Sequence, residues 1–107
     1  MHGIVFKGTL PLDTYEMYDR VTEEIYKHAG PDHPLWQECL LHMCQPTDEG
    51  FTVTEVWTTE ARAQEFWDKY LRPALEATGH DAEQIGRDAV HFEPYSFEVR
   101  ERKLEDP

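Results

Sequence analysis

The spacing of apolar residues in this chain alternates between strand-like and helix-like patterns, and the order of those patterns restricts the fold. Short runs rich in β-branched and aromatic residues at 2–7, 35–45, 51–57 and 89–100 predict four strands. Apolar residues recur at helical spacing within 13–29 and 60–78. The order β-α-β-β-α-β predicts an α+β domain, a ferredoxin-like split β-α-β-β-α-β sandwich.

Capping and breaking residues predict where the two helices begin and end. Asp13 is placed as an N-cap, and Glu16 three residues later completes a capping-box pattern. The segment 29–31, Ala-Gly-Pro, predicts the end of this helix. One of the two threonines at 58–59 is expected to cap the second helix, which Pro73 should kink or split.

Length and charge narrow the class of protein. The 107 residues suffice for one domain, assigned to residues 1–100, with a charged tail over 101–107. Ten basic against 22 acidic residues give a net charge of −12, which argues against binding to nucleic acid or to a membrane surface. Without a signal-peptide pattern or a long apolar run, we expect a soluble, cytoplasmic protein. Its two cysteines, Cys39 and Cys44, are expected to be free, half-buried thiols.

The hairpin expected around residues 46–50 brings ionisable and aromatic side chains to one sheet face. If Gln45 pairs with Gly50, then His42 lies opposite Val53, and Glu55 is within diagonal reach of His42 on the same face. A slip of one residue would reverse the grouping between the strands. The last strand adds further candidates of matching parity, His91, Tyr95 and Phe97.

These side chains suit proton transfer to a flat apolar molecule. A carboxylate with aromatic neighbours loses hydration and becomes a candidate general base or acid, and a neutral imidazole shuttles protons near pH 7. We therefore predict Glu55, His42 and His91 as catalytic residues. The residues predicted to contact the substrate are aromatic: Trp57, Phe51, Tyr95, Tyr18, Phe66 and Tyr70. For each of these residues, a purely structural role in packing or hydrogen bonding is the competing interpretation.

Several segments resemble the antibiotic biosynthesis monooxygenase-like proteins of the dimeric α/β-barrel superfamily. They are Tyr-Asp-Arg-Val at 18–21, His42 before a short turn, and Gly-Phe-Thr-Val-Thr-Glu-Val-Trp at 50–57. Phe-Trp-Asp-Lys-Tyr-Leu-Arg-Pro-Ala-Leu at 66–75 and Val-His-Phe at 90–92 add to the likeness. The resemblance covers about residues 2–99 and implies a homodimer whose sheets pack face to face.

The resemblance implies a cofactor-independent monooxygenase or cyclase acting on an aromatic or polyketide-like substrate. The alternatives are a non-enzymatic ligand-binding or accessory homodimer and a structural dimer module without a pocket. No nucleotide-binding motif occurs, and the helix 60–78 lacks the histidine that a haem-degrading relative would need. A metal held by His42, Glu55 and His91 has no supporting ligand spacing, so we expect neither metal nor cofactor.

Overall fold

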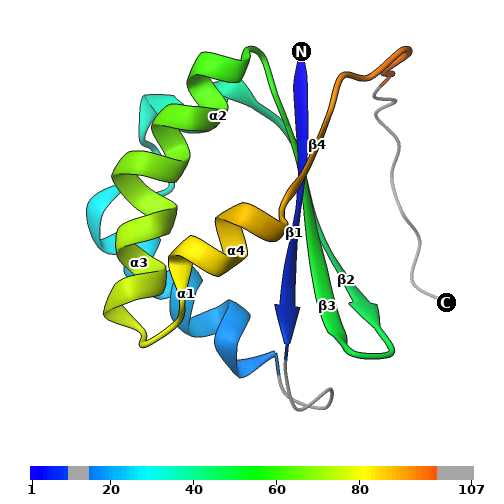
Figure 1. Ribbon diagram of the computed structural model, residues 1–107. Coiled ribbons are helices and arrows are strands. Elements are labelled where there is room, and N and C mark those ends of the chain that lie inside the picture. Colours follow the sequence, from blue (N-terminus) through cyan, green and yellow to red (C-terminus); the bar gives the residue numbers. More distant parts are fainter. Residues whose placement is uncertain (10–14, 99–107) are drawn as a thin grey trace, which may run out of the picture.

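The computed structural model describes residues 1–9 and 15–98, which form one four-stranded antiparallel sheet with helices on one of its faces (Figure 1). The strand order is β2-β3-β1-β4, so the predicted α+β class is confirmed and the arrangement is compatible with a ferredoxin-like fold. No helix in this described part is both long and apolar enough to cross a membrane. The elements in chain order are β1 (His2–Thr9), α1 (Glu16–His28), the 3-10 helix η1 (Pro34–Glu38), β2 (Cys39–Thr47), β3 (Gly50–Trp57), α2 (Glu60–Phe66), the π-helical segment η2 (Trp67–Leu71), α3 (Arg72–Ala77), α4 (Ala82–Asp88) and β4 (Val90–Phe92).

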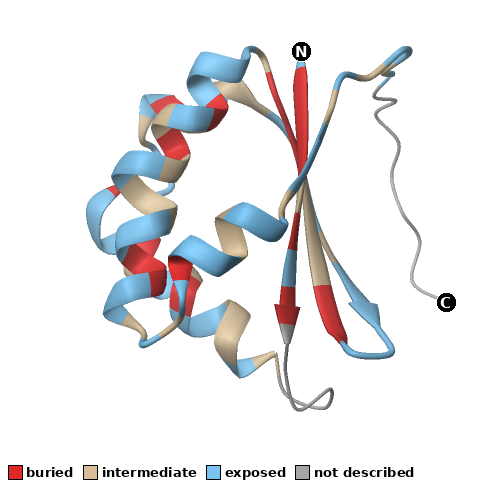
Figure 2. Cartoon of the chain, viewed as in Figure 1, coloured by how far each residue is buried: buried red, intermediate tan, exposed pale blue. Residues whose placement is uncertain are grey.

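The hydrophobic core lies between the sheet and the helices. Buried residues follow the sides of the helices and strands that face one another, and exposed residues occupy the opposite helix surfaces (Figure 2). Helical and strand periodicity produce this pattern, because one stripe of each helix and alternate residues of each strand turn inward. The core comprises Ile4, Phe6, Val21, Ile25, Leu35, Trp57, Ala63, Phe66, Ala74, Leu75 and Ala82.

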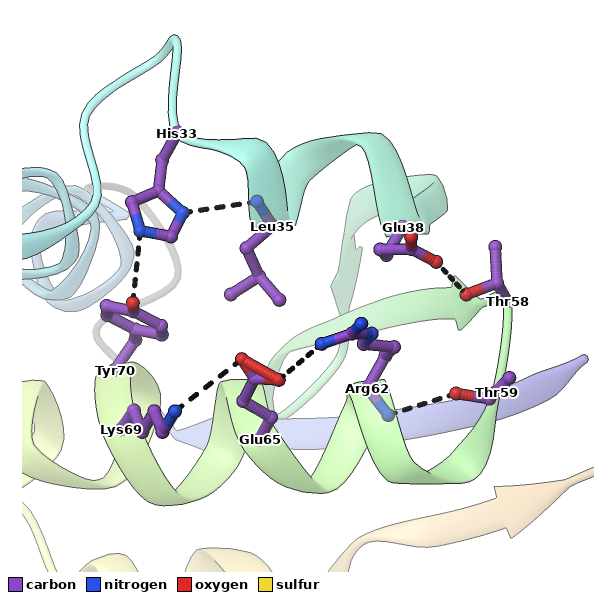
Figure 3. A network of polar contacts seen from close by, with 9 residues as sticks. All are labelled: His33, Leu35, Glu38, Thr58, Thr59, Arg62, Glu65, Lys69 and Tyr70. Atoms are coloured by element: carbon purple, nitrogen blue, oxygen red, sulfur yellow. Dashed lines mark hydrogen bonds and ion pairs between the residues drawn. The ribbon is translucent and has the colours of Figure 1, made fainter.

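Two of the predicted helix ends can be compared with the structure. Helix α1 ends at His28, directly before the predicted 29–31 signal. The Thr59 hydroxyl accepts a hydrogen bond from the Arg62 amide at 3.1 Å, so a threonine caps α2 as expected (Figure 3). Asp13 lies outside the described residues; Tyr15 precedes α1 with left-handed backbone angles and no side-chain cap.

Polar contacts join the segment just before β2 to η2 and to the residue that follows β3 (Figure 3). The Nδ1 atom of His33 accepts from the Leu35 amide at 3.1 Å, and its Nε2 lies 3.2 Å from the Tyr70 hydroxyl. Thr58, just after β3, donates to the Glu38 carboxylate at the end of η1. These contacts fix the chain where it enters β2 and leaves β3.

The helical segment around Pro73, which the sequence predicted to be kinked or split, is irregular but not split. The segment 60–77 runs on through α2, η2 and α3 without splitting, and the five residues before Arg72 have π-helical hydrogen bonding. Proline has no amide hydrogen, and its ring crowds the carbonyl four residues earlier. A wider, π-helical turn accommodates that crowding without a break in the helical segment.

Helix α4 was not predicted from the sequence, which indicated no element between the helix expected to end near residue 78 and the strand expected from residue 89. Asp81 caps it by accepting from the Gln84 amide at 3.1 Å. Ala82 is buried, and Ile85 packs against the core. The sequence signals for this helix were the N-cap Asp81 and the spacing of Ala82, Ile85 and Ala89, the last of which follows the helix as its C-cap. They were weak because the helix has only seven residues.

The β2–β3 register differs from the predicted one by two residues. Thr47 pairs with Gly50, so the turn is Asp48-Glu49 and His42 lies directly opposite Glu55 instead of Val53. A shift of two residues preserves parity, so the predicted grouping of His42 with Glu55 on one face is retained. Pro46 lies within edge strand β2, where a missing amide donor is tolerated.

A bulge near Leu40 changes the parity of the start of β2. Cys39 pairs with Trp57 and Leu41 with Val56, so one extra residue stands between these pairs. Cys39 therefore lies on the same face as Cys44, not on the opposite face as strict alternation would require. Both cysteines are free and partly buried, as predicted.

The last strand is much shorter than the predicted segment 89–100. β4 ends at Phe92, and Pro94 follows two residues later, where its fixed φ and missing amide hydrogen disfavour further pairing. Tyr95 and Phe97 therefore do not lie on a strand with His91. The predicted tail, 101–107, lies outside the described residues.

The packing of α4 against η2 predicts that replacement of Gly86 destabilises the protein. A Cβ at Gly86 would stand 2.7 Å from Cζ2 of Trp67, and that ring is held by stacking on Phe6. We expect Gly86→Ala to lower the free energy of unfolding by about 1–3 kcal/mol in urea denaturation. Gly30→Ala is the control, because a Cβ added there would meet nothing within 4 Å and the change should be neutral or slightly stabilising. Equal stability of Gly86→Ala and wild type would contradict this packing.

Candidate functional site

A buried carboxylate, Glu55, lies near the middle of the sheet. It is only 2% exposed and stands between Ile4 of β1 and His42 of β2. Its Oε2 atom is 2.9 Å from Nδ1 of His42, and its Oε1 accepts from the indole Nε1 of Trp57 at 3.3 Å. Both oxygens therefore have a nitrogen partner, as a buried carboxylate requires.

His42 connects this buried group to the molecular surface. It lies on edge strand β2, and its side chain is 44% exposed. Its Nε2 atom is 2.6 Å from the hydroxyl of Tyr18. A carboxylate only accepts hydrogen bonds, so the proton of a neutral imidazole lies on Nδ1 and Nε2 accepts from the phenol. This arrangement leaves Nε2 as the basic nitrogen.

Helix α1 positions Tyr18 over the hairpin. Val21 and Ile25 are buried on the same helix and hold α1 against the sheet, and the Tyr18 ring contacts Phe51 edge-on at 6.1 Å between centroids. Partial burial, and secondly the negative charge of a Cys44 thiolate, raise the pKa of the Tyr18 phenol. Tyr18 is therefore a neutral hydrogen-bond donor at neutral pH.

A small apolar cavity adjoins the hydrogen-bonded row formed by Tyr18, His42 and Glu55. Its volume is about 70 Å³, and its walls come from α1, the sheet, α4 and the helical segment 60–77 formed by α2, η2 and α3. All three side chains of the row are among the residues that line it. The apolar part of the wall includes Phe6, Met17, Val21, Ile25, Phe51, Val53, Phe66, Leu71, Leu75 and Ile85.

The six aromatic residues predicted to contact substrate are divided by the structure. Phe51, Phe66 and Tyr18 line the cavity. Trp57 does not line it; this side chain is fully buried and its indole faces Glu55. Tyr70 does not line it and instead lies within hydrogen-bond distance of His33, and Tyr95 is fully exposed after β4.

His91 lies in the same cross-strand row as the other two predicted catalytic residues but does not meet them. The row runs His42, Glu55, Ile4, His91, so a buried isoleucine separates His91 from Glu55. Two strand spacings of about 4.8 Å each set that separation. His91 instead contacts His2, with Nε2 of His2 2.8 Å from Nδ1 of His91.

The sequence prediction missed the apolar wall that α1 contributes to the cavity. Met17, Val21, Thr22 and Ile25 all line it. Their helical spacing was visible, but it is equally the signature of an ordinary core-facing stripe. The bond from Tyr18 to His42 had no sequence signal, because 24 residues separate them and only the packing of α1 on the hairpin joins them.

The chemistry open to the site is proton transfer at Nε2 of His42. Among residues 1–9 and 15–98, no three or more His, Cys, Asp and Glu side chains form a group suited to a metal ion. The imidazole can accept a proton at Nε2 while Glu55 stabilises the resulting positive charge. Tyr18 can donate a hydrogen bond to an oxygen placed in the cavity.

Comparisons with known proteins leave function to be argued from this geometry. No protein-family model, curated protein or solved structure matches the chain. The predicted membership of the monooxygenase-like family therefore stays a prediction. The feature of the molecule that points to a function is the placement of Tyr18, His42 and Glu55 beside the apolar cavity.

The hydrogen-bond directions predict the tautomer of His42. At neutral pH its ring proton should reside on Nδ1, the less common form of a free imidazole, because the Glu55 carboxylate accepts from it. Nitrogen-15 NMR of the imidazole should detect this form in the wild type and in Tyr18→Phe. In Glu55→Gln the population should move towards the ordinary Nε2-protonated form. An Nε2-protonated ring in the wild type would refute the assignment.

Proposed function

We propose that this protein is a small-molecule enzyme, a cofactor-independent monooxygenase or cyclase that acts on an aromatic or polyketide-like substrate by acid/base chemistry. The observation supporting this proposal is the hydrogen-bonded row Tyr18–His42–Glu55 in the wall of an apolar cavity. A base oriented by a buried carboxylate, beside a surface suited to aromatic rings, fits deprotonation of a hydroxylated ring system.

In this proposal Nε2 of His42 removes a proton from the substrate. The imidazolium that forms is stabilised by Glu55, which Trp57 holds in place through its indole hydrogen bond. The substrate oxygen displaces the Tyr18 hydroxyl from Nε2, and Tyr18 then donates to the oxyanion. The apolar wall strengthens these interactions because it excludes water from the reacting atoms.

The deprotonated substrate, whose negative charge is shared between oxygen and carbon, can react in two ways. In the oxygenase reaction, a carbanion form of the substrate adds dioxygen to give a hydroperoxide, which loses water and leaves a carbonyl. The substrate supplies all the electrons, and one oxygen atom ends in the product and the other in water. In the cyclase reaction, the carbanion attacks a carbonyl of the same molecule, and water is then eliminated. Both reactions use the same proton acceptor, His42.

The size of the cavity limits how the substrate binds. Ligand sites usually measure about 300–1,000 Å³, whereas this cavity measures about 70 Å³. We therefore propose that Tyr18 swings away from His42 when the substrate enters and so enlarges the cavity. The exposed side of His42, on the edge strand, provides the route of entry.

A second candidate function is a ligand-binding or accessory protein without turnover. The observation that favours it is the 2.6 Å contact between Tyr18 and His42, which already satisfies the basic nitrogen. In that case the row is a structural network, and a flat apolar molecule would bind without being changed. Product analysis distinguishes the two functions.

We also propose a homodimer, formed through the face of the sheet that no described helix covers (Figure 1). Two cross-strand rows on that face are largely apolar, Met43–Thr54–Val5–Val90 and Leu41–Val56–Gly3–Phe92. Met43 and Val90 are 44% and 50% exposed. Face-to-face packing of two such sheets, as in a dimeric α/β barrel, would remove these rows from water.

Substitution of the proton-transfer residues tests the proposed activity. Wild type incubated with phenols, naphthols and naphthohydroquinones should consume dioxygen, or yield dehydrated cyclic product, above the protein-free rate. Glu55→Gln and His42→Gln should each reduce turnover by roughly 10²–10⁴-fold. His28→Gln, an exposed substitution on α1, serves as the control. Full turnover in both folded variants would reject the assignment, and saturable binding without product would favour the ligand-binding function.

Sedimentation equilibrium tests the proposed dimer. The wild type should sediment at twice the 12.6 kDa chain mass. Met43→Lys combined with Val90→Lys should give monomer, because two buried charges would face each other across the interface without partners. Ala61→Lys, at an exposed position of α2, should leave the mass unchanged. A monomeric wild type at high micromolar concentration would contradict the proposal.

A further inference from the structure

Two histidines on neighbouring strands direct ring nitrogens at each other, away from the candidate active site. His2 lies on β1 and His91 on β4, in diagonal positions of the β1–β4 pair. Nε2 of His2 and Nδ1 of His91 are 2.8 Å apart, and the ring planes are tilted by 44°. His2 is only 8% exposed, so its ring is held in place by the surrounding residues.

The separation of these nitrogens suits a shared cation as well as a shared proton. In the metal-free protein one imidazole donates and the other accepts. A late first-row divalent ion binds imidazole nitrogen at about 2.0–2.1 Å, so two nitrogens at right angles around it lie about 3 Å apart. The observed 2.8 Å matches that spacing, and to bind such an ion each ring must turn so that its nitrogen lone pair points at the ion instead of at the other ring.

The surroundings of the pair favour positive charge and leave room for water. Beside it is a cavity of about 240 Å³, lined in part by the carboxylate side chains of Glu60 and Glu83. Neither forms an ion pair within the described residues, whereas the one arginine in the wall, Arg72, is paired with Glu76 at 3.0 Å. The uncompensated charge beside the pair is therefore negative.

This second cavity is separate from the one beside His42. The two share only Phe6 among the residues that line them. Ile4 stands between Glu55 and His91 in the cross-strand row, so the imidazole pair has no contact with the proton-transfer row. Its ligand chemistry is consequently independent of the proposed function.

We propose that His2 and His91 form a two-histidine chelating site for a late first-row divalent cation such as Cu²⁺, Ni²⁺ or Zn²⁺. The two imidazole nitrogens occupy adjacent coordination positions. Water fills the remaining positions, because the described residues supply no cluster of three metal-ligating side chains. Those water positions face the 240 Å³ cavity, where a small anionic or neutral ligand can replace them.

Calorimetric titration of the full chain with each metal tests the site. One ion should bind per chain, with Cu²⁺ tighter than Ni²⁺ and Zn²⁺, and with no binding of Mg²⁺, which prefers oxygen ligands. The electron paramagnetic resonance spectrum of the Cu²⁺ complex should show coupling to two imidazole nitrogens.

Substitution of either histidine should remove this binding. His91→Asn and His2→Asn keep a polar side chain for hydrogen bonding and should each weaken Cu²⁺ and Ni²⁺ binding by at least about tenfold. His28→Asn, on the exposed end of α1, is the matched control and should bind as wild type. Circular dichroism checks that both site variants are folded. Absence of Cu²⁺ binding to the wild type, or unchanged binding in both folded site variants, would overturn the proposal.

Discussion

A carboxylate buried at the centre of the sheet is the constraint that organises the neighbouring side chains. An unpartnered charge in such a place costs several kcal/mol, so Glu55 requires donors on both oxygens. Trp57, two residues along the same strand, supplies one, and His42 on the adjacent strand supplies the other. Because His42 also contacts Tyr18 at 2.6 Å, the hydrogen bonding that satisfies Glu55 continues from the core to helix α1.

Local irregularities in the hairpin decide whether these groups meet. A two-residue turn at Asp48-Glu49 brings His42 opposite Glu55, where a longer turn would have placed Val53 there. The bulge near Leu40 then lets Cys39 face inward beside the core, although strict alternation would turn it outward. The site therefore depends on turn length as much as on the identity of its residues.

On the face of the sheet that the helices cover, one apolar residue separates two pairs of polar side chains. Ile4 lies between the Glu55–His42 pair and His91, and it is buried. Each polar side chain therefore hydrogen-bonds on its own side of Ile4: Glu55 with His42, and His91 with His2. Two cavities of different character, one almost wholly apolar and one lined by carboxylates and imidazoles, lie on either side of this division.

The amino-acid sequence by itself determined the class of the fold, the residue at which α1 ends, the threonine at which α2 begins, and the face shared by His42 and Glu55. These features follow from periodicity, capping and parity, which are local or depend only on whether a position is odd or even. Tertiary structure alone decided the hairpin register, the π-helical turn before Pro73, the short helix α4 and the contact of Tyr18 with His42. The contact of Tyr18 with His42 depends on how segments distant in sequence pack together. The register, the π-helical turn and α4 each have local alternatives of similar free energy, and packing against the rest of the fold selects among them because the local preferences of turns and short helices are weak.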